Sequence, residues 1–192
     1  MPAFGAGGAI MRVQAARGTA EGAMAAKAGW EGRYLEDFVA GDVFRSRVGR
    51  TVSEADNTWF TLLTNNDNQI HFNAEYAKRT QWGQRLVNST FTLALVTGLT
   101  VTDVSQNGVA LGWDSVRLPN PLFAGDTVWA ETEVLSVRES RSDPTRGIVT
   151  VRTRGVKQDG TVVIEFERSI LVWKRAHAPA GSAFPEIVAP PD

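Results

Sequence analysis

The chain has 192 residues and a mass of 20.9 kDa, with 43% hydrophobic and 21% charged residues, which fits one globular domain with a substantial core. Its formal net charge of −1 means that the chain lacks the excess of positive charge that nucleic-acid binding requires. No apolar stretch reaches the roughly 18–20 residues that a membrane span needs. Because the chain has no cysteine, disulfides, thiol nucleophiles and thiolate metal sites are excluded. We therefore expect a cytoplasmic protein that binds neither nucleic acid nor a membrane and holds no metal.

Composition divides the chain into three parts. Residues 1–29 are rich in alanine and glycine, contain all three methionines and lack the continuous apolar run of a secretory signal, so we expect a flexible extension. Residues 176–192 are rich in proline and have no hydrophobic periodicity, which predicts an irregular arm. The folded domain is expected over residues 30–175.

The first half of this domain predicts a strand followed by helices. Residues 43–48 have strand character, and a helix is expected after Ser53, an N-cap residue that Asp56 complements in a capping box. Asn65 is expected to end this helix, because asparagine tolerates left-handed backbone geometry. A short second helix is expected to begin at Asn73. Four apolar side chains are expected to form the buried face of the first helix: Trp59, Phe60, Leu62 and Leu63.

The second half predicts one very apolar helix and then only strands. The segment from Asn88 to Val101 is apolar nearly all round, which is typical of a helix enclosed by its neighbours. The strands that follow alternate or are β-branched, and Asp159-Gly160 predicts a tight hairpin turn between two of them. They are expected over residues 109–118, 127–137, 148–151 and 162–173. This order predicts an α+β fold in which a curved antiparallel sheet of about four strands wraps around a central apolar helix.

His71 is the principal candidate for catalysis. The chain has only two histidines, and the other, His177, lies in the predicted arm, so His71 is the one side chain of the domain suited to carry a proton near neutral pH. It follows a run of polar residues, 64–69, after the first helix. A purely structural role, in which His71 closes the loop by a hydrogen bond to the backbone, is the alternative interpretation.

Several motifs together resemble those of the MaoC-like hydratases and dehydratases, hotdog-fold enzymes related to the (R)-specific enoyl-CoA hydratases. The resemblance extends over residues 33–174 and implies a single hotdog domain. The motifs that carry it are Asn68-x-x-His71, Tyr76-Ala77, Gly83-x-x-Leu86-Val87 and Pro121-x-x-x-Gly125-Asp126.

The resemblance also implies a set of site residues. The family signature is similar to Gly-Asp-x-Asn-Pro-x-His, and here His71 and Asn68 match it, whereas Asn66 stands at the position of the catalytic aspartate and Asp67 one position later. The helix-start dipeptide, whose backbone amide binds the thioester oxygen, corresponds to Asn88-Ser89. The hydroxyl residue of the central helix corresponds to Thr97. These departures indicate a divergent branch, similar to hydratases of branched or dicarboxylic enoyl-CoA substrates such as mesaconyl-CoA.

Asn66 leaves three outcomes open, since a carboxamide can hold a water molecule but does not exchange a proton at neutral pH. His71 performs both proton transfers through one water, or Asp67 swings into the site because Gln69 replaces the family proline and relaxes the loop. In the third outcome hydration is lost and the pocket only binds thioesters. For Asp67 the structural alternative is a solvated loop carboxylate, and for Thr97 a hydroxyl bonded to the preceding helical turn.

The resemblance therefore implies an enoyl-CoA hydratase or 3-hydroxyacyl-CoA dehydratase that needs no cofactor beyond the coenzyme A of its substrate and works as a homodimer or a multiple of it. An acyl-CoA thioesterase on the same fold is a second hypothesis, but it would need a carboxylate on the central helix, and residues 90–102 contain none. A non-catalytic subunit that binds acyl-CoA is the third, and Asn66 is its main support.

Overall fold

The computed structural model describes residues 27, 29–179 and 185. The chain divides into two units, Met1–Trp30 and Glu31–Asp192, and the described helices and strands all belong to the second. Most of the predicted extension, residues 1–29, and most of the predicted arm, residues 176–192, fall outside the described residues, so these domain limits stay predictions.

A six-stranded antiparallel sheet forms the outer layer of the fold. In spatial order its strands are β1 (Val43–Arg45), β4 (Thr127–Glu139), β5 (Arg146–Lys157), β6 (Val162–Trp173) and β3 (Gly108–Arg117), and β2 (Arg50–Thr51) also pairs with β4. The four strands predicted in the second half are confirmed. The first strand is shorter than predicted, and β2 was not predicted.

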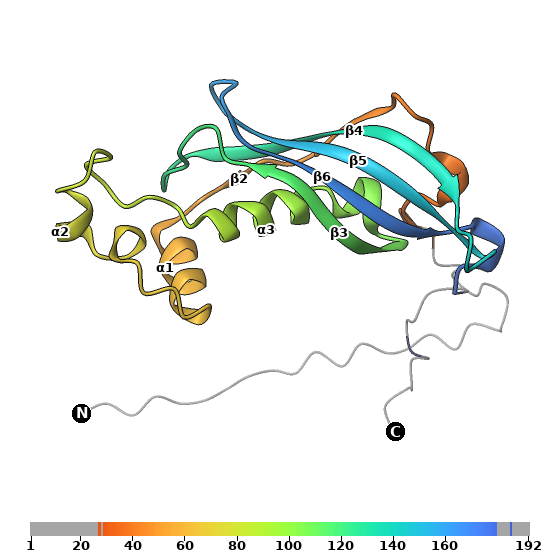
Figure 1. Ribbon diagram of the computed structural model, residues 1–192, viewed down its shortest axis with the longest axis horizontal. Helices are drawn as coiled ribbons and strands as arrows, with labels where there is room; N and C mark the ends of the chain where they lie inside the picture. The colour runs from red at the N-terminus through yellow and green to blue at the C-terminus, as the bar shows by residue number, and fades with distance from the viewer. Residues whose placement is uncertain (1–26, 28, 180–184, 186–192) are drawn as a thin grey trace, which may run out of the picture. The chain divides into compact units, whose positions relative to one another are not determined.

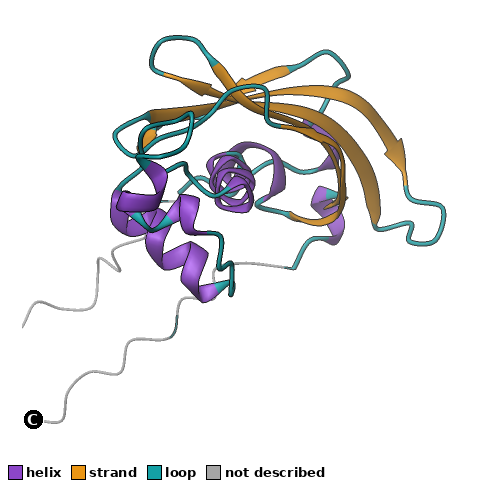
Figure 2. Cartoon of the chain, turned by 60° about the vertical axis from the view of Figure 1, so that its left-hand side comes forward, coloured by secondary structure: helices purple, strands orange, loops and turns teal. Residues whose placement is uncertain are grey.

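The sheet curves around one helix, α3 (Ser89–Leu99), as Figures 1 and 2 show. Val96 in the middle of α3 is completely buried against the sheet. Close packing depends on Gly155 of β5, because a Cβ there would lie only 2.6 Å from Cγ2 of Val96. This arrangement confirms the predicted α+β hotdog fold.

Helix α3 begins as predicted and ends earlier. The Oδ1 atom of Asn88, its N-cap, accepts a hydrogen bond from the backbone N–H of Thr90 at 2.9 Å, which satisfies one of the free donors of the first turn. The regular helix ends at Leu99 instead of Val101, and a π-helical segment, Val101–Ser105, follows it.

Helix α1 (Glu54–Leu63) confirms the predicted caps but not the predicted buried face. Ser53 and Asp56 form the capping box, and Asn65 has a φ of 54°, the left-handed geometry expected after the helix. However, Trp59 is 70% exposed and Leu63 75% exposed, Leu62 is also exposed and Phe60 is only partly buried. The buried residues of α1 are instead polar, Asn57 and Thr61, because hydrogen bonds inside the domain satisfy them.

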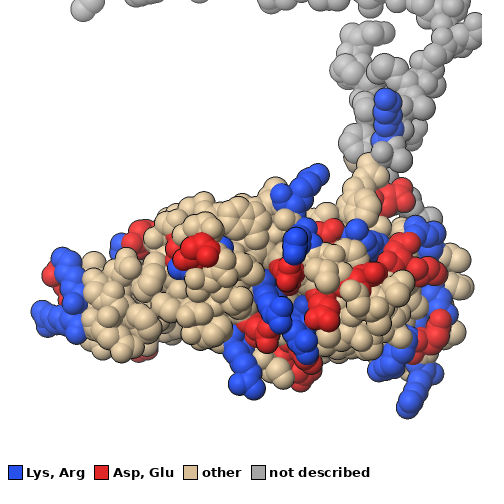
Figure 3. Space-filling view, turned by 90° about the horizontal axis from the view of Figure 1, so that it is seen from above, with Lys and Arg blue, Asp and Glu red and all other residues tan. Residues whose placement is uncertain are grey.

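The outer surface of the sheet carries interspersed charges of both signs (Figure 3). Arg152 of β5 pairs with Glu133 of β4 and Glu167 of β6, and Arg154 pairs with Glu165. Such exposed pairs keep this surface hydrated and add little stability each. None of the described helices is long and apolar enough to cross a lipid bilayer.

Candidate active site

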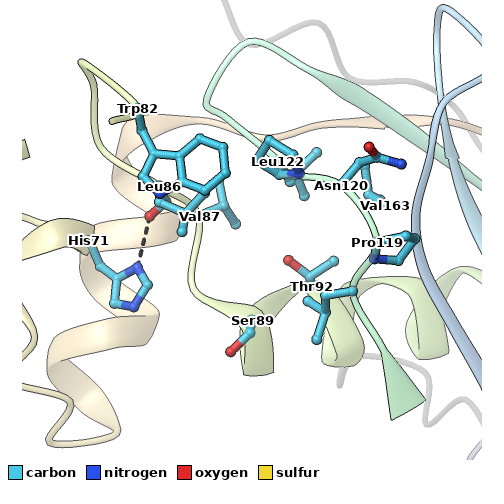
Figure 4. Close-up of a pocket in the computed structure, with 12 residues that line it drawn as sticks. His71, Trp82, Leu86, Val87, Ser89, Thr92, Pro119, Asn120, Leu122 and Val163 are labelled. Carbon is cyan, nitrogen blue, oxygen red and sulfur yellow. Dashed lines mark hydrogen bonds between the residues drawn. The ribbon is translucent and has the colours of Figure 1, made fainter. Parts of the chain in front are cut away.

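A pocket of about 220 Å³ opens between the start of α3, the loop before it and the connection from β3 to β4 (Figure 4). Its wall is mostly apolar and includes a few polar residues, as small-molecule sites commonly do. The lining residues are His71, Trp82, Leu86, Val87, Ser89, Thr92, Leu118, Pro119, Asn120, Pro121, Leu122 and Val163. Of the predicted site residues, His71 and Ser89 therefore line one pocket.

His71 lies in the pocket wall in a fixed orientation. It is in the short 3-10 helix η2 (Gln69–His71), is only 8% exposed, and its Nδ1 atom is 2.9 Å from the backbone oxygen of Leu86 (Figure 4). A carbonyl oxygen only accepts hydrogen bonds, so Nδ1 carries the proton of the neutral ring. The Nε2 atom is thereby left with its lone pair and can accept a proton.

The buried side chain of Asn57 connects the three segments that form this part of the site. Its amide group donates hydrogen bonds to the backbone oxygens of His71, at 2.8 Å, and Leu86, at 3.1 Å. Its Oδ1 atom accepts a hydrogen bond from the backbone N–H of Asn88, at 2.9 Å. One side chain of α1 therefore positions the histidine, the segment before α3 and the start of α3 relative to one another.

Replacing Asn57 with alanine is expected to destabilise the domain by about 3 kcal/mol, because the backbone oxygen of His71 and the backbone N–H of Asn88 lose their partner and the oxygen of Leu86 loses one of its two. Urea unfolding of the purified protein measures this loss. Gln84→Ala, which removes an exposed amide side chain nearby, serves as the control and should change stability by less than about 0.5 kcal/mol. Equal stability of the two variants would contradict the role of Asn57.

The first turn of α3 has two backbone N–H groups, those of Ser89 and Phe91, without an acceptor among the described residues, and of these two residues only Ser89 lines the pocket. The N–H of Asn88 is bonded to Asn57 and that of Thr90 to the Asn88 side chain, whereas that of Ser89 has no acceptor among the described residues. A free N–H at the positive end of a helix dipole can stabilise a negatively charged oxygen. Asn88 caps α3 and donates a hydrogen bond to Thr61. The binding of a thioester oxygen at Asn88-Ser89 stays a prediction, and Ser89 is the residue of this pair whose N–H has no acceptor among the described residues.

The other predicted residues of the polar loop shape its backbone. The Oδ1 atom of Asn66 accepts a hydrogen bond from the backbone N–H of Asn68, and that of Asn68 accepts one from the N–H of Ile70. Asp67 is exposed. Asn66, Asp67 and Asn68 are not among the residues that line the pocket, so their predicted roles in the reaction stay predictions.

Thr97 lies two turns after Ser89 on α3 and is also outside the pocket lining. Its Oγ1 atom is buried and has no hydrogen-bond partner among the described residues. The bond to the preceding helical turn, which was the structural alternative for this hydroxyl, is therefore absent.

No group of three or more histidine, aspartate or glutamate residues in the described part of the chain has the geometry of a metal site. Two cations of the segment between η2 and α3 form ion pairs outside the pocket lining, Lys78 with Glu75 at 2.6 Å and Arg85 with Glu54 at 2.9 Å. The histidine is thus the one described ionisable side chain in the pocket lining.

The sequence did not indicate two parts of the site. Asn57 was missed because a polar side chain on an amphipathic helix is ordinarily assigned to the solvent side. The sequence motif Pro121-x-x-x-Gly125-Asp126 does not by itself indicate that residues 118–122 form a wall of the pocket. There Oδ2 of Asp126 accepts a hydrogen bond from the N–H of Phe123, and Gly125 has a φ of 96°, so the motif builds the turn that places this wall.

Known proteins share this fold. A crystal structure of a MaoC-like dehydratase from Rhodospirillum rubrum superimposes with a TM-score of 0.67 and 29% sequence identity, covering 74% of this chain and 98% of that one. An (R)-specific enoyl-CoA hydratase of the same species is 28% identical over 139 residues, which are 72% of this chain and 91% of that protein. The fold is therefore that of the MaoC-like hotdog hydratases.

A narrower assignment follows from two further matches. A family model described as mesaconyl-CoA hydratase matches residues 20–184, and a mesaconyl-CoA hydratase of Cereibacter sphaeroides is 36% identical over 153 residues, 78% of this chain and 44% of that protein. The chain belongs to the mesaconyl-CoA hydratase family. It spans about half the length of the curated relatives it matches first, between 42% and 49%.

Proposed function

We propose that this protein hydrates an enoyl-CoA thioester, or dehydrates the corresponding 3-hydroxyacyl-CoA, and that its substrate is a branched, dicarboxylic acyl thioester of the mesaconyl-CoA type. The observation that carries the proposal is the buried His71, held by Leu86 with Nε2 free, in the same pocket as the open N–H of Ser89. The names of its relatives, which include mesaconyl-CoA hydratase and beta-methylmalyl-CoA dehydratase, support the substrate class.

The chemistry follows from these two groups. The thioester oxygen accepts a hydrogen bond from the N–H of Ser89, which stabilises the negative charge that develops there when the double bond is attacked. Nε2 of His71 takes a proton from water as the water oxygen bonds to the β-carbon, and the protonated ring then gives a proton to the α-carbon, directly or through Asp67, which restores the neutral imidazole. Asn66 orients the water or Asp67 provides the second titrating group. The coenzyme A of the substrate is the only cofactor the proposal needs, and we place the reaction in the cytoplasm.

A panel of enoyl-CoA thioesters tests this function against its two alternatives. Hydration removes the absorbance of the conjugated double bond without releasing coenzyme A, a thioesterase releases coenzyme A, and a non-catalytic subunit does neither. The absence of an acidic residue from α3, whose sequence is STFTLALVTGL, argues against the thioesterase. Failure of every thioester to react would favour the binding subunit.

The proposal includes assembly into a homodimer or a multiple of it. β3 is an edge strand of the sheet, so its outer backbone groups are available for pairing, and a second copy would extend the sheet across a twofold axis. Exposed large apolar side chains gather on β3 and just after it: Val109, Leu111, Trp113, Val116 and Leu118.

Leu111→Arg is therefore expected to convert a dimer into monomers, because it places a charge in an apolar contact. Sedimentation velocity measures the change. Val43→Arg is a matched control on the opposite edge strand β1, since Val43 is 53% exposed and Leu111 is 55% exposed. A monomeric wild type, or a dimer that persists in Leu111→Arg, would contradict pairing through β3.

A further inference from the structure

Arg168 is an unusual residue of the core. It lies on β6 between the buried residues Phe166 and Ile170, on the side of the sheet that faces α3, and is only 2% exposed. No carboxylate forms an ion pair with it among the described residues, and burial lowers the pKa of its guanidinium to about 10. Burying a charged group without a counter-charge lowers the stability of the folded protein. A buried, unpaired arginine such as Arg168 therefore indicates a function that offsets this loss.

Among the described residues the guanidinium has one hydrogen-bond partner. Its Nη2 atom donates a hydrogen bond to Oγ1 of Thr100 at 2.9 Å, and that hydroxyl in turn donates to the backbone oxygen of Thr97 at 2.7 Å. The end of α3 carries partial negative charge, which helps to accommodate the cation. Nε of Arg168 and Oγ1 of Thr97 both remain without a hydrogen-bond partner among the described residues. Arg168, Thr100 and the backbone of Thr97 are thus linked by hydrogen bonds into a small cluster, and two of its residues, Arg168 and Thr97, each carry a donor without an acceptor among the described residues.

This cluster and the pocket lie along the same helix. Ser89, which lines the pocket, is followed after one turn by Leu93 and after two by Thr97, so the three side chains form a row on one side of α3. Leu93 is only partly buried. Ser89 and Thr97 are eight residues apart, which corresponds to about 12 Å along the helix axis. An acyl chain whose thioester is held at Ser89 would run toward the cluster along this row.

We propose that the cluster of Arg168, Thr100 and Thr97 recognises the distal carboxylate of a dicarboxylic acyl thioester, so that Arg168 determines specificity for diacids over monoacids. The inference rests on the proposed function of the pocket. It adds the residue that binds the carboxylate at the distal end of the acyl group. A carboxylate would accept hydrogen bonds from the guanidinium and from the Thr97 hydroxyl, and would supply the counter-charge that the core lacks. Trp113 of β3 is the residue paired with Arg168 across the β3–β6 ladder, and it is half-exposed.

Binding of saturated thioesters tests the inference without requiring turnover. Isothermal titration calorimetry compares succinyl-CoA with butyryl-CoA and adipyl-CoA with hexanoyl-CoA, pairs that differ by one carboxylate at equal chain length. Wild type is expected to bind the diacid of at least one pair at least tenfold more tightly. Arg168→Met should abolish this preference while the affinity for the monoacid changes less than about twofold. Arg168→Lys should retain part of it.

Two controls keep the result interpretable. Arg154→Met removes one positive charge from the outer surface of the sheet and should leave the preference unchanged. Thr100→Val removes the hydroxyl that holds Arg168 and should weaken the preference even if Arg168→Met does not fold. Absence of a diacid preference in wild type, or its persistence in Arg168→Met, would overturn the role of Arg168. If the preference is present but no enoyl-CoA is hydrated, the proposed reaction fails and the recognition of diacids stands.

Discussion

Replacing His71 with alanine is expected to abolish hydration, with a loss of at least about two orders of magnitude in turnover, because no other titrating side chain lines the described pocket. The fold should persist, since the backbone oxygen of Leu86 keeps its hydrogen bond from Asn57 when the imidazole is removed. Loss of the enoyl absorbance measures turnover, and circular dichroism with thermal melting measures the fold.

His177→Ala is the matched control for this experiment. It removes the only other histidine of the chain, which is exposed at the C-terminal end of the domain and outside the pocket lining. Its turnover should equal that of wild type. If His71→Ala keeps activity within a few-fold of wild type, His71 has no part in proton transfer and its role is to close the loop.

The second large effect on turnover is expected from substitutions of Asp67 and Asn66, the two candidates for the group that assists His71 in proton transfer. Asp67→Asn is nearly isosteric and removes only the charge and the proton. If Asp67 swings into the site, this change should lower turnover by two or more orders of magnitude and remove one limb of the pH–rate profile. If Asn66 orients the water, Asp67→Asn should be mild and Asn66→Ala severe. Since Asn66 also accepts the N–H of Asn68, loop order has to be checked in parallel by thermal melting.

Asn66→Asp separates these mechanisms further, because it places a carboxylate at the position that the resemblance assigns to the catalytic acid. Activity on simple enoyl-CoA substrates should rise if a missing carboxylate limits the wild type. If wild type and all three variants, Asp67→Asn, Asn66→Ala and Asn66→Asp, are equally inert on every thioester, hydration is excluded and the binding-subunit hypothesis takes its place.

Local signals in the sequence predicted local structure well. Ser53 with Asp56, Asn73 and Asn88 each cap a helix as expected, because a cap depends on a side chain and the backbone within three residues of it. The hairpin at Asp159-Gly160 likewise follows from local geometry, with Gly160 at a φ of 84°.

Predictions that required knowledge of distant partners were less successful. The buried face of α1 was assigned to its apolar side chains, yet Asn57 faces inward because the backbone of residues 71, 86 and 88 offers it three complementary groups. None of these partners can be identified from the spacing of residues along α1. For the same reason the sequence gives no sign that Arg168 differs from the other charged residues of the strands. Only the structure shows that it is buried on the side of the sheet that faces α3.

The topology of the sheet also determines the order in which the chain can fold. The β4–β5 and β5–β6 hairpins close over short turns, whereas β1 joins β4 across a long separation: Arg45 and Glu131, which pair between them, are 86 residues apart. Because long loops cost more entropy to close, the meander is expected to form first and the two edge strands last. The pocket wall between β3 and β4 would then assemble after the rate-limiting step. Substitutions there should accelerate unfolding far more than they slow refolding.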